Sequence, residues 1–481
     1  MSIATLAPES LWQNFSDLNA VPRPSKKEER VIRFIEQFAQ KLGLEHSTDA
    51  IGNVLVKKPA SAGREQQPAV ALQSHLDMVC QKSTGTDFDF DSQGIRMRLE
   101  GDWVCAEGTT LGADNGIGVA AIMAILAAQD LVHPPLEALF TIDEETGMTG
   151  ARGLAGGLMQ ARVMLNLDTE DDCELTIGCA GGLDVQATCS YEEAEISEEH
   201  DFVEVSLKGL TGGHSGLDIH KGRANANKLM NRFLYAATLK FGLRIASIDG
   251  GGLRNAIPRE SSAVVAVPRK RLQEFQAYVA EESAHYAKEY QVTDPECHLS
   301  SALRPGPSKV MDRDFQTKLL CTVYTVNNGI YRMSPDVPGL VQTSNNLARL
   351  SVQDGRFFLA CLTRGSVDSE KMDLATALRC PLELMGAEVT FSGGYPGWTP
   401  RPEAGIVKLM SGLYRELFGE EPRVTACHAG LECGILGANY PDMEMISFGP
   451  NIHGAHSPDE KVQVSSVQKF WKLLTATLAR L

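Results

Sequence analysis

Five short segments of the chain each carry a residue type that binds metal ions in proteins. The segments are SHLDM, LGADNG, DEETGM, NLDTE and GAHSPDE, and the residues are His75, Asp114, Glu145, Asp168 and His456. Two imidazoles and three carboxylates suit divalent cations of hard to borderline character. A carboxylate can also bridge two ions with its two oxygens. If the five side chains meet in space, the sequence predicts a hydrolase with two metal ions.

Short apolar strands precede three of these residues. Residues 69–72 lead into His75, residues 136–142 end just before Glu145, and residues 163–167 end just before Asp168. Residues 115–129 are apolar enough to form a helix packed on a sheet. This alternation predicts an α/β fold with a largely parallel sheet and flanking helices. The three residues then lie beyond the carboxyl ends of strands, where open α/β sheets build their sites.

Each of these residues also has a plainer explanation. Asp114 is suited to N-cap the helix that follows it, and adjacent glutamates are common as surface charge. Placement at strand ends favours the interpretation as a metal site over these plainer explanations. In an extended segment Asp77 lies on the same face as His75, where its carboxylate can hold the second ring nitrogen of a metal-bound imidazole. Glu144 points away from Glu145, so one carboxylate can bind metal while the other acts as a general base on water.

The pattern of apolar and polar residues changes near residue 186, and the earlier pattern returns near residue 394. A helix is expected at 25–43, with Ser25 as its N-cap, and the acidic residues 192–199 are expected to form a solvated connection. A strand at 202–208, a helix at 223–240 and a strand-turn-strand pattern at 341–364 follow. We therefore expect a catalytic domain formed by residues 1–185 and 395–481, with residues 186–394 as an inserted α+β domain of two ferredoxin-like halves.

The inserted domain has its own candidate residues. Gly212–Gly216 contains His214, which a glycine-rich loop can bring to a carbonyl oxygen that gains negative charge, although a plain turn is an equal alternative. Asn255 and Arg364 are candidate substrate contacts, since a guanidinium fork suits a carboxylate. The segment 427–433, CHAGLEC, mixes ligand types, but a thiolate zinc site there would need two further ligands that the sequence does not offer.

Bulk properties exclude some classes of protein. The 481 residues carry 45 basic and 61 acidic side chains, a net charge of -16, which argues against nucleic acid or an anionic membrane as a partner. Secretory signals and long apolar stretches of membrane-spanning length are absent from the sequence. Eleven cysteines include no C-x-x-C pair. These features predict a cytoplasmic protein with reduced thiols.

The motifs occur in an order that resembles a known family. They are HLDM, GTTLGADNG, EETGM, NLDTE, GLTGGHSG, RNAIPRE, GYPGW, HAGLECG and GAHSPDE. Together they resemble the aminoacyl-histidine dipeptidases (peptidase D, carnosinase-like), within the metallopeptidases that include aminoacylases, tripeptidases and carboxypeptidase G. The resemblance runs from about residue 10 to the end of the chain.

The resemblance implies a site with two zinc ions, or cobalt or manganese, bridged by Asp114 and a hydroxide. It implies that His75 and Asp168 complete the shell of one ion, and Glu145 and His456 that of the other. Asp77 then orients His75, and Glu144 is the general base. His214 polarises the substrate carbonyl from a movable lid. Asn255 and Arg364 match positions that bind the carboxy-terminal end of the substrate, and we expect Glu432 to face its free amine.

The expected reaction is hydrolysis of small unblocked dipeptides, preferentially Xaa-His. One alternative is an aminoacylase that uses the same metal centre on N-acyl amino acids. A binding protein that retains the fold without catalysis, and a cysteine-dependent hydrolase, are alternatives of other classes. The sequence leaves both a monomer and a homodimer open.

Overall fold

The structure is a computed structural model that describes residues 3–481. The chain forms two compact units. The first contains the residues up to Gly178 together with Trp398–Ala426 and Leu431–Leu481, and the second contains Cys179–Gly397 and Cys427–Gly430. The expected boundary at 185/186 falls inside strand β9 (Gly181–Ser190), which belongs wholly to the second unit. None of the helices in the described residues is long and apolar enough to cross a membrane.

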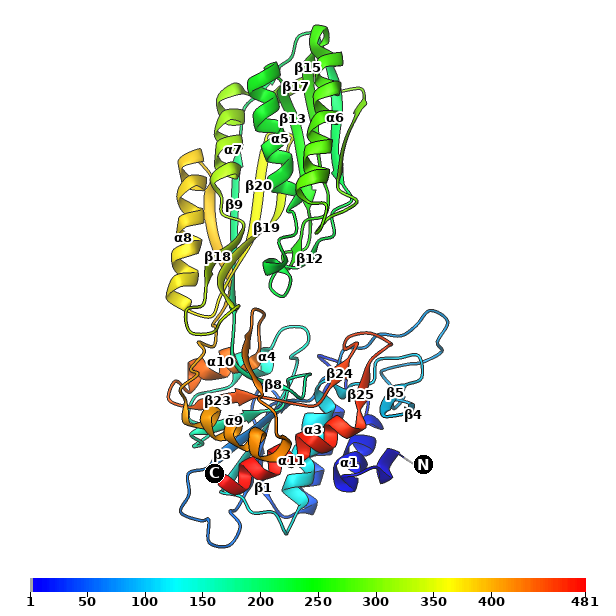
Figure 1. Cartoon of the computed structure of the whole chain (residues 1–481), viewed down its shortest axis with the longest axis vertical. Helices are drawn as coiled ribbons and strands as arrows, with labels where there is room; N and C mark the ends of the chain where they lie inside the picture. The colour runs from blue at the N-terminus through cyan, green and yellow to red at the C-terminus, as the bar shows by residue number, and fades with distance from the viewer. Residues whose placement is uncertain (1–2) are drawn as a thin grey trace. The chain divides into compact units, whose positions relative to one another are not determined.

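The first unit is built on an eight-stranded sheet in the order β1-β2-β6-β3-β7-β23-β8-β22. Figure 1 labels β1, β3, β8 and β23 of this sheet. The four central strands β6, β3, β7 and β23 are parallel, and β1, β2 and β8 are antiparallel to their neighbours. Every residue of β3 and β6 is buried, as expected for strands covered on both faces. The strands are β1 (Glu45–Thr48), β2 (Val54–Lys58), β3 (Val70–His75), β6 (Leu136–Thr141), β7 (Val163–Asn166), β8 (Glu174–Cys179), β22 (Arg423–Cys427) and β23 (Glu444–Ser447). The prediction of a mostly parallel central sheet is confirmed.

Helices surround this sheet. Helix α3 is apolar on all sides and buried along almost its whole length, packing on β3 and against α1. A separate four-stranded sheet in the order β24-β25-β5-β4 joins residues near 100 to residues near 460. The remaining elements of the first unit are η1 (Ile3–Thr5), α1 (Glu9–Asn19), α2 (Glu29–Lys41), β4 (Met97–Glu100), β5 (Trp103–Ala106), α3 (Ala113–Ala127), α4 (Thr149–Gly153), α9 (Gly405–Phe418), α10 (Glu432–Asn439), β24 (Ile452–His453), β25 (Lys461–Gln463) and α11 (Val464–Arg480).

The start of α2 differs from the prediction. The helix begins at Glu29, with Glu28 rather than Ser25 at the N-cap position. The chain turns at Lys26, where φ is 65°, and Ser25 stands three residues before the N-cap position. The Ser25 hydroxyl instead donates a hydrogen bond of 2.8 Å to Oδ2 of Asp77.

The second unit contains a nine-stranded sheet in the order β16-β11-β15-β13-β19-β20-β9-β21, with β18 beside β19. All of its described strand pairs are antiparallel. Helix α6 (Leu272–Glu289) packs on β15 and β16, and helix α8 (Asp368–Met385) packs on β9, β20 and β21. Alternate residues of β11 are buried, as in a sheet with one covered face. The strands are β9, β11 (His200–Lys208), β13 (Arg244–Gly251), β15 (Ser261–Pro268), β16 (His298–Leu303), β18 (Gly329–Met333), β19 (Val341–Gln353), β20 (Arg356–Gly365) and β21 (Glu388–Tyr395).

The predicted hairpin at 341–364 is present as β19 and β20. Its turn residues Asp354 and Gly355 have φ values of 51° and 71°, as a type I′ turn requires. The acidic stretch is not simply a solvated connection, because Glu193–Glu195 pairs with Lys309–Met311. The other elements are β10 (Glu193–Glu195), β12 (Gly213–His214), η2 (Ile219–Lys221), α5 (Ala226–Phe241), β14 (Ala256–Ile257), η3 (Arg269–Arg271), α6 (Leu272–Glu289), β17 (Lys309–Met311), α7 (Arg313–Thr325) and α8 (Asp368–Met385).

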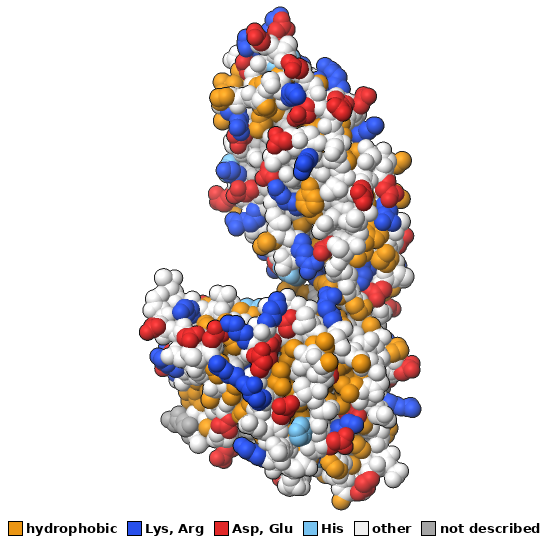
Figure 2. Space-filling model, turned by 180° about the vertical axis from the view of Figure 1, so that it is seen from behind, with side chains coloured by type: hydrophobic (Ala, Val, Ile, Leu, Met, Phe, Trp, Pro, Cys, Tyr) orange, Lys and Arg blue, Asp and Glu red, His pale blue; other side chains and the backbone are white. Residues whose placement is uncertain are grey.

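Charged side chains are distributed evenly over the surface that Figure 2 shows. Acidic and basic groups are interspersed on this face of each unit, and apolar side chains lie between them. This face therefore carries no broad patch of a single charge sign.

Candidate active site

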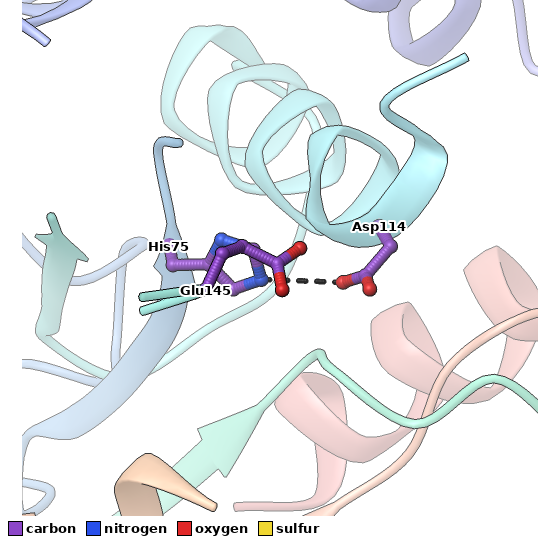
Figure 3. A group of neighbouring side chains, drawn as sticks. All are labelled: His75, Asp114 and Glu145. Carbon is purple, nitrogen blue, oxygen red and sulfur yellow. Dashed lines mark hydrogen bonds and ion pairs between the residues drawn. The ribbon is translucent and has the colours of Figure 1, made fainter. Parts of the chain in front are cut away.

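The first unit brings all five predicted metal ligands together. Nε2 of His75 lies 3.2 Å from Oδ1 of Asp114 and 3.4 Å from Oδ1 of Asp168. Nε2 of His456 lies 3.1 Å from Oδ2 of Asp114 and 3.0 Å from Oε2 of Glu145. Figure 3 shows the His75 ring and the Glu145 carboxylate pointing toward Asp114 from separate elements. The five side chains thus form two groups that share Asp114.

Asp114 has the geometry of a bridging ligand, because each of its oxygens faces a different imidazole. It follows Gly112, whose φ of 70° only glycine adopts readily, and its own backbone is not helical although it lies in the first turn of α3. Gly112 occupies the N-cap position of this helix, and the Asp114 oxygens contact His75 and His456 instead. The alternative in which Asp114 serves as the N-cap is therefore not what the structure has.

The residues fit a pair of divalent ions. Ligand atoms around a tetrahedral zinc ion lie about 3.4 Å apart, given bonds of about 2.1 Å, and the four contacts above are close to that separation. Oε1 of Glu145 is buried and has no hydrogen-bond partner, as expected of an oxygen reserved for a cation. Three carboxylates gathered around two imidazoles also need positive charge beyond what the imidazoles supply.

Strand ends position these ligands. His75 is the last residue of β3, and Asp168 and Glu145 follow the parallel neighbours β7 and β6 by a few residues. His456 comes from the loop between β24 and β25, where its φ of 64° turns the chain. The side chain of His456 is 54% exposed, whereas that of His75 is 1% exposed. One side of the centre is therefore open and the other is sealed by the sheet.

Asp77 links the ligands to the predicted base. Its Oδ1 lies 3.4 Å from Nδ1 of His75 and accepts a hydrogen bond of 3.0 Å from the backbone N–H of Glu144. Its Oδ2 accepts from the backbone N–H of Glu145 at 3.2 Å and from Ser25. One buried carboxylate therefore holds the His75 ring and the backbone of the segment that carries both glutamates.

The charges of the site are strongly coupled. Hydrogen bonds to Asp114 and Glu145 raise the pKa of His456 to about 11. Burial opposes ionisation of Asp114, but hydrogen bonds from His456 and His75 lower its pKa. Burial raises the pKa of Glu144 well above its ordinary value, and Asp168 adds to this effect. Without cations the site therefore retains protons.

Glu432, the first residue of α10, is only 1% exposed. Its Oε2 accepts hydrogen bonds of 2.7 Å from Nε2 of Gln73 and 2.7 Å from Oγ1 of Thr141, while Oε1 is buried without a partner. Gln73 also accepts a hydrogen bond from Asn166. Burial raises the pKa of Glu432 to about 7. The carboxylate thus joins β3 and β6, and Gln73 extends this network to β7, while the contact of Glu432 with a substrate amine stays a prediction.

The second unit brings His214 and Arg364 together. Nη2 of Arg364 lies 3.4 Å from Nε2 of His214, and Nη1 donates to the Tyr395 hydroxyl at 3.1 Å. Nδ1 of His214 accepts from the backbone N–H groups of Gly216 and Leu217 at 3.2 and 3.0 Å. This pattern assigns the proton of the neutral ring to Nε2. Burial and the charge of Arg364 lower the pKa of His214, so the ring stays neutral.

The loops around His214 include the third predicted residue of this unit. Strand β12 pairs with β14, so that His214 stands opposite Ala256, and the carbonyl of Asn255 accepts from the Ser215 N–H at 2.8 Å. The Asn255 side chain itself is exposed.

Two further residues of this cluster, the half-buried Tyr395 and the buried His428, are not among those predicted from the sequence. Tyr395 lies in the GYPGW motif and His428 in HAGLECG, and the motifs alone do not indicate these contacts. Nε2 of His428 lies 2.7 Å from Oγ of Ser344. Burial lowers the pKa of His428 to about 3. Within residues 3–481 neither Cys427 nor Cys433 joins a group of close ligand atoms, so the thiolate zinc site gains no support.

The chain is similar to known proteins in sequence and in fold. Residues 71–480 match peptidase family M20/M25/M40. The cytosol non-specific dipeptidase of Escherichia coli (strain K12) is 39% identical over 481 residues, which cover 99% of this chain and 98% of that protein. A crystal structure of aminoacylhistidine dipeptidase from Vibrio alginolyticus superposes with a TM-score of 0.95 at 40% identity, covering 100% of this chain and 98% of that one.

A more distant structure shares the fold. Aminopeptidase PepT from Bacillus cereus has a TM-score of 0.57 at 15% identity, over 98% of each chain. The family match spans most of this chain, and the Escherichia coli relative aligns along nearly its entire length. The chain belongs to peptidase family M20/M25/M40.

Proposed function

We propose that this protein is a metal-dependent dipeptidase that hydrolyses small unblocked dipeptides, preferentially those of the Xaa-His type. The observation that carries the proposal is Asp114, whose two oxygens face His75 and His456 at 3.2 and 3.1 Å. Two relatives with about 40% identity over the whole chain are named as dipeptidases, one as non-specific and one as an aminoacylhistidine dipeptidase.

Two divalent ions, zinc by the nitrogen and oxygen donor set, are proposed to occupy the site. His75, Asp114 and Asp168 would hold one ion, and Asp114, Glu145 and His456 the other. When bound, such a pair lowers the pKa of an attacking water and stabilises negative charge on the carbonyl oxygen.

The chain's own residues then move the proton. Glu144 takes the proton of the attacking water at its carboxylate and gives it to the nitrogen of the leaving amine. Its position is set by the hydrogen bond from its backbone N–H to Asp77 at 3.0 Å. Asp77 also holds the ring of His75, so the ligand and the base depend on one support.

The second unit is proposed to act as the lid. His214 offers an N–H donor for the carbonyl oxygen, and Arg364 offers a guanidinium for the substrate carboxylate, with Asn255 nearby. The first unit is the proposed catalytic domain. We place the protein in the cytoplasm, without nucleic acid or membrane as a partner, and a homodimer is compatible with this function.

A metal analysis combined with a dipeptide panel tests the proposal. Purified protein should contain divalent metal and cleave Xaa-His dipeptides faster than other dipeptides and N-acetyl amino acids. A chelator should abolish cleavage, and zinc, cobalt or manganese should restore it. Cleavage that survives complete metal removal would refute the mechanism. Faster cleavage of N-acetyl amino acids than of any dipeptide would identify an aminoacylase instead.

A further inference from the structure

A carboxylate from far along the chain binds the backbone turn that carries Asp114. Oε2 of Glu460 accepts hydrogen bonds from the N–H groups of Leu111 at 2.7 Å and Gly112 at 2.9 Å. Oε1 accepts from those of Ala113 at 2.8 Å and Asp114 at 3.2 Å. Glu460 is 2% exposed. Both of its oxygens are therefore committed to four consecutive amides.

The opposite side of the same turn is held by a guanidinium. Nη2 of Arg23 donates to the carbonyl of Gly112 at 2.6 Å and to Oδ1 of Asn19 at 3.1 Å. Nη1 donates to the carbonyls of Leu76 and Asp77, each at 3.1 Å. Arg23 is 1% exposed. It therefore joins the segment that follows His75 to the turn that precedes Asp114.

The two charges support each other. Burial lowers the pKa of Arg23, and Glu460 is the strongest of the charges that oppose this effect. A buried charge that loses its partner is strongly destabilising. The turn lies between them, with its N–H groups toward the anion and a carbonyl toward the cation, so both charges are satisfied by backbone dipoles.

The glycines of the LGADNG motif are required by this arrangement. A Cβ atom on Gly112 would lie 2.4 Å from Nη2 of Arg23, and one on Gly116 would lie 2.7 Å from the same atom. Real Cβ contacts are never so short, so any side chain at either position would displace the guanidinium. The motif thus leaves room for Arg23 as well as shaping the turn.

We propose that Arg23 and Glu460 are positioning residues, which fix Asp114 between the segments of His75 and His456 and so set the affinity of the metal centre. Glu460 follows His456 by four positions in the same loop, so one segment supplies a ligand and the support for the bridging ligand. The inference rests on the proposed metal function. Support of metal ligands by neighbouring groups commonly changes metal affinity 10- to 100-fold.

The variant Glu460→Gln gives the sharpest test. The glutamine amide retains the shape, but its NH₂ group would face two backbone N–H donors that need an acceptor. We expect zinc affinity, measured by competition with a chromophoric chelator on the full-length protein, to fall about 10- to 100-fold. The zinc-induced rise in melting temperature should shrink in parallel. Asp459→Asn, which removes the same charge at an exposed neighbour, should leave both quantities unchanged.

Arg23→Lys is a second and milder change. A lysine keeps the positive charge but cannot offer the two-pronged guanidinium that serves four acceptors, so zinc affinity should fall again. Circular dichroism of the metal-free variants separates a lost fold from a lost site. If folded Glu460→Gln and Arg23→Lys bind zinc as tightly as Asp459→Asn does, the inference is wrong and the proposed function still stands. A wild-type protein that binds no divalent ion would overturn the proposed function as well.

Discussion

The guanidinium of Arg364 and the imidazole of His214 face each other, and each presents an N–H donor to the other. Nη2 of the guanidinium lies 3.4 Å from Nε2 of the imidazole, whose other nitrogen accepts from two backbone N–H groups. Two N–H groups that converge without an acceptor between them are satisfied by an oxygen that binds to both. The second unit therefore presents two converging donors, as the proposed contact with a substrate oxygen requires.

Replacing His214 by Gln should lower kcat by about 10²- to 10³-fold, the usual cost of removing one donor to a developing oxyanion. KM should change little, because the donor acts mainly on charge that develops during the reaction. Steady-state kinetics on an Xaa-His dipeptide measures both constants. His220→Gln, an exposed histidine in the same loop, is the matched control. A rise in KM with unchanged kcat would assign His214 to ground-state binding.

Replacing Arg364 by Lys should raise KM for dipeptides about 10- to 100-fold, because a charge-assisted pair with a carboxylate is replaced by a single point charge. Dipeptide amides, which lack the carboxylate, should be cleaved equally by both proteins. Arg254→Lys, which changes an exposed arginine of the same unit, should behave as wild type. An equal loss on dipeptides and their amides would contradict the assignment.

Substitutions of the two adjacent glutamates should separate an effect on the catalytic step from an effect on metal binding. Glu144→Gln should lower kcat about 10²- to 10⁴-fold with full metal content, because it removes a general base. Glu145→Gln should lower the metal content, since Oε2 of Glu145 lies 3.0 Å from Nε2 of His456 in the ligand group. Metal analysis together with kcat decides the outcome. Metal loss in Glu144→Gln, with retention in Glu145→Gln, would reverse the two roles.

Glu432 provides a test of the predicted contact with the substrate amine. Its carboxylate is buried and engaged by Gln73 and Thr141, so Glu432→Gln should weaken the support of the strand ends. We expect kcat/KM to fall about tenfold for Ala-His and for N-acetyl-Ala-His alike. The ratio of the two values should therefore stay that of the wild type. If the ratio of kcat/KM for Ala-His to that for N-acetyl-Ala-His falls toward one in the variant, the amine contact predicted from the sequence is supported.

His428 should make the protein sensitive to acid. Its folded-state pKa of about 3 lies below the ordinary value of 6.5. The unfolded chain therefore binds the proton more readily, and stability falls as pH drops from 6.5 toward 3. The loss between pH 7 and pH 5 should be about 2 kcal/mol.

Urea unfolding at the two pH values measures this loss. His428→Gln, whose amide can still reach Ser344, should remove most of the difference. His298→Gln, at an exposed position, should retain it. Equal pH dependence in wild type and His428→Gln would show that the ring titrates normally.

Three of the five proposed ligands were predictable from sequence because each has a local signature, whereas Asp114 and His456 depended on the order of the motifs. His75, Glu145 and Asp168 follow apolar strands, and parallel strands bring such positions to one edge of the sheet. Their supports have no such signature. Arg23 binds a carbonyl 89 positions away, and Glu460 binds an amide 346 positions away, both through backbone groups that every residue possesses.

A motif can also mislead when its residues belong to two different units of the structure. HAGLECG reads as one segment, yet His428 belongs to the second unit and Glu432 to the first. Ala180 draws the segment to the second unit by donating to the carbonyls of Cys427 and Ala429, each at 3.0 Å. Ser25 suits a helix N-cap by its residue type, but its hydroxyl donates to Asp77, and the next residue, Lys26, has a positive φ.

The separation of Asp114 and His456 has a consequence for biosynthesis. The two ligands are 342 positions apart. At about 5–20 residues per second, a ribosome needs roughly 20 to 70 s to travel between them. Throughout that time the nascent chain lacks the last of the proposed ligands, so the proposed metal centre assembles only after the ribosome has passed residue 456.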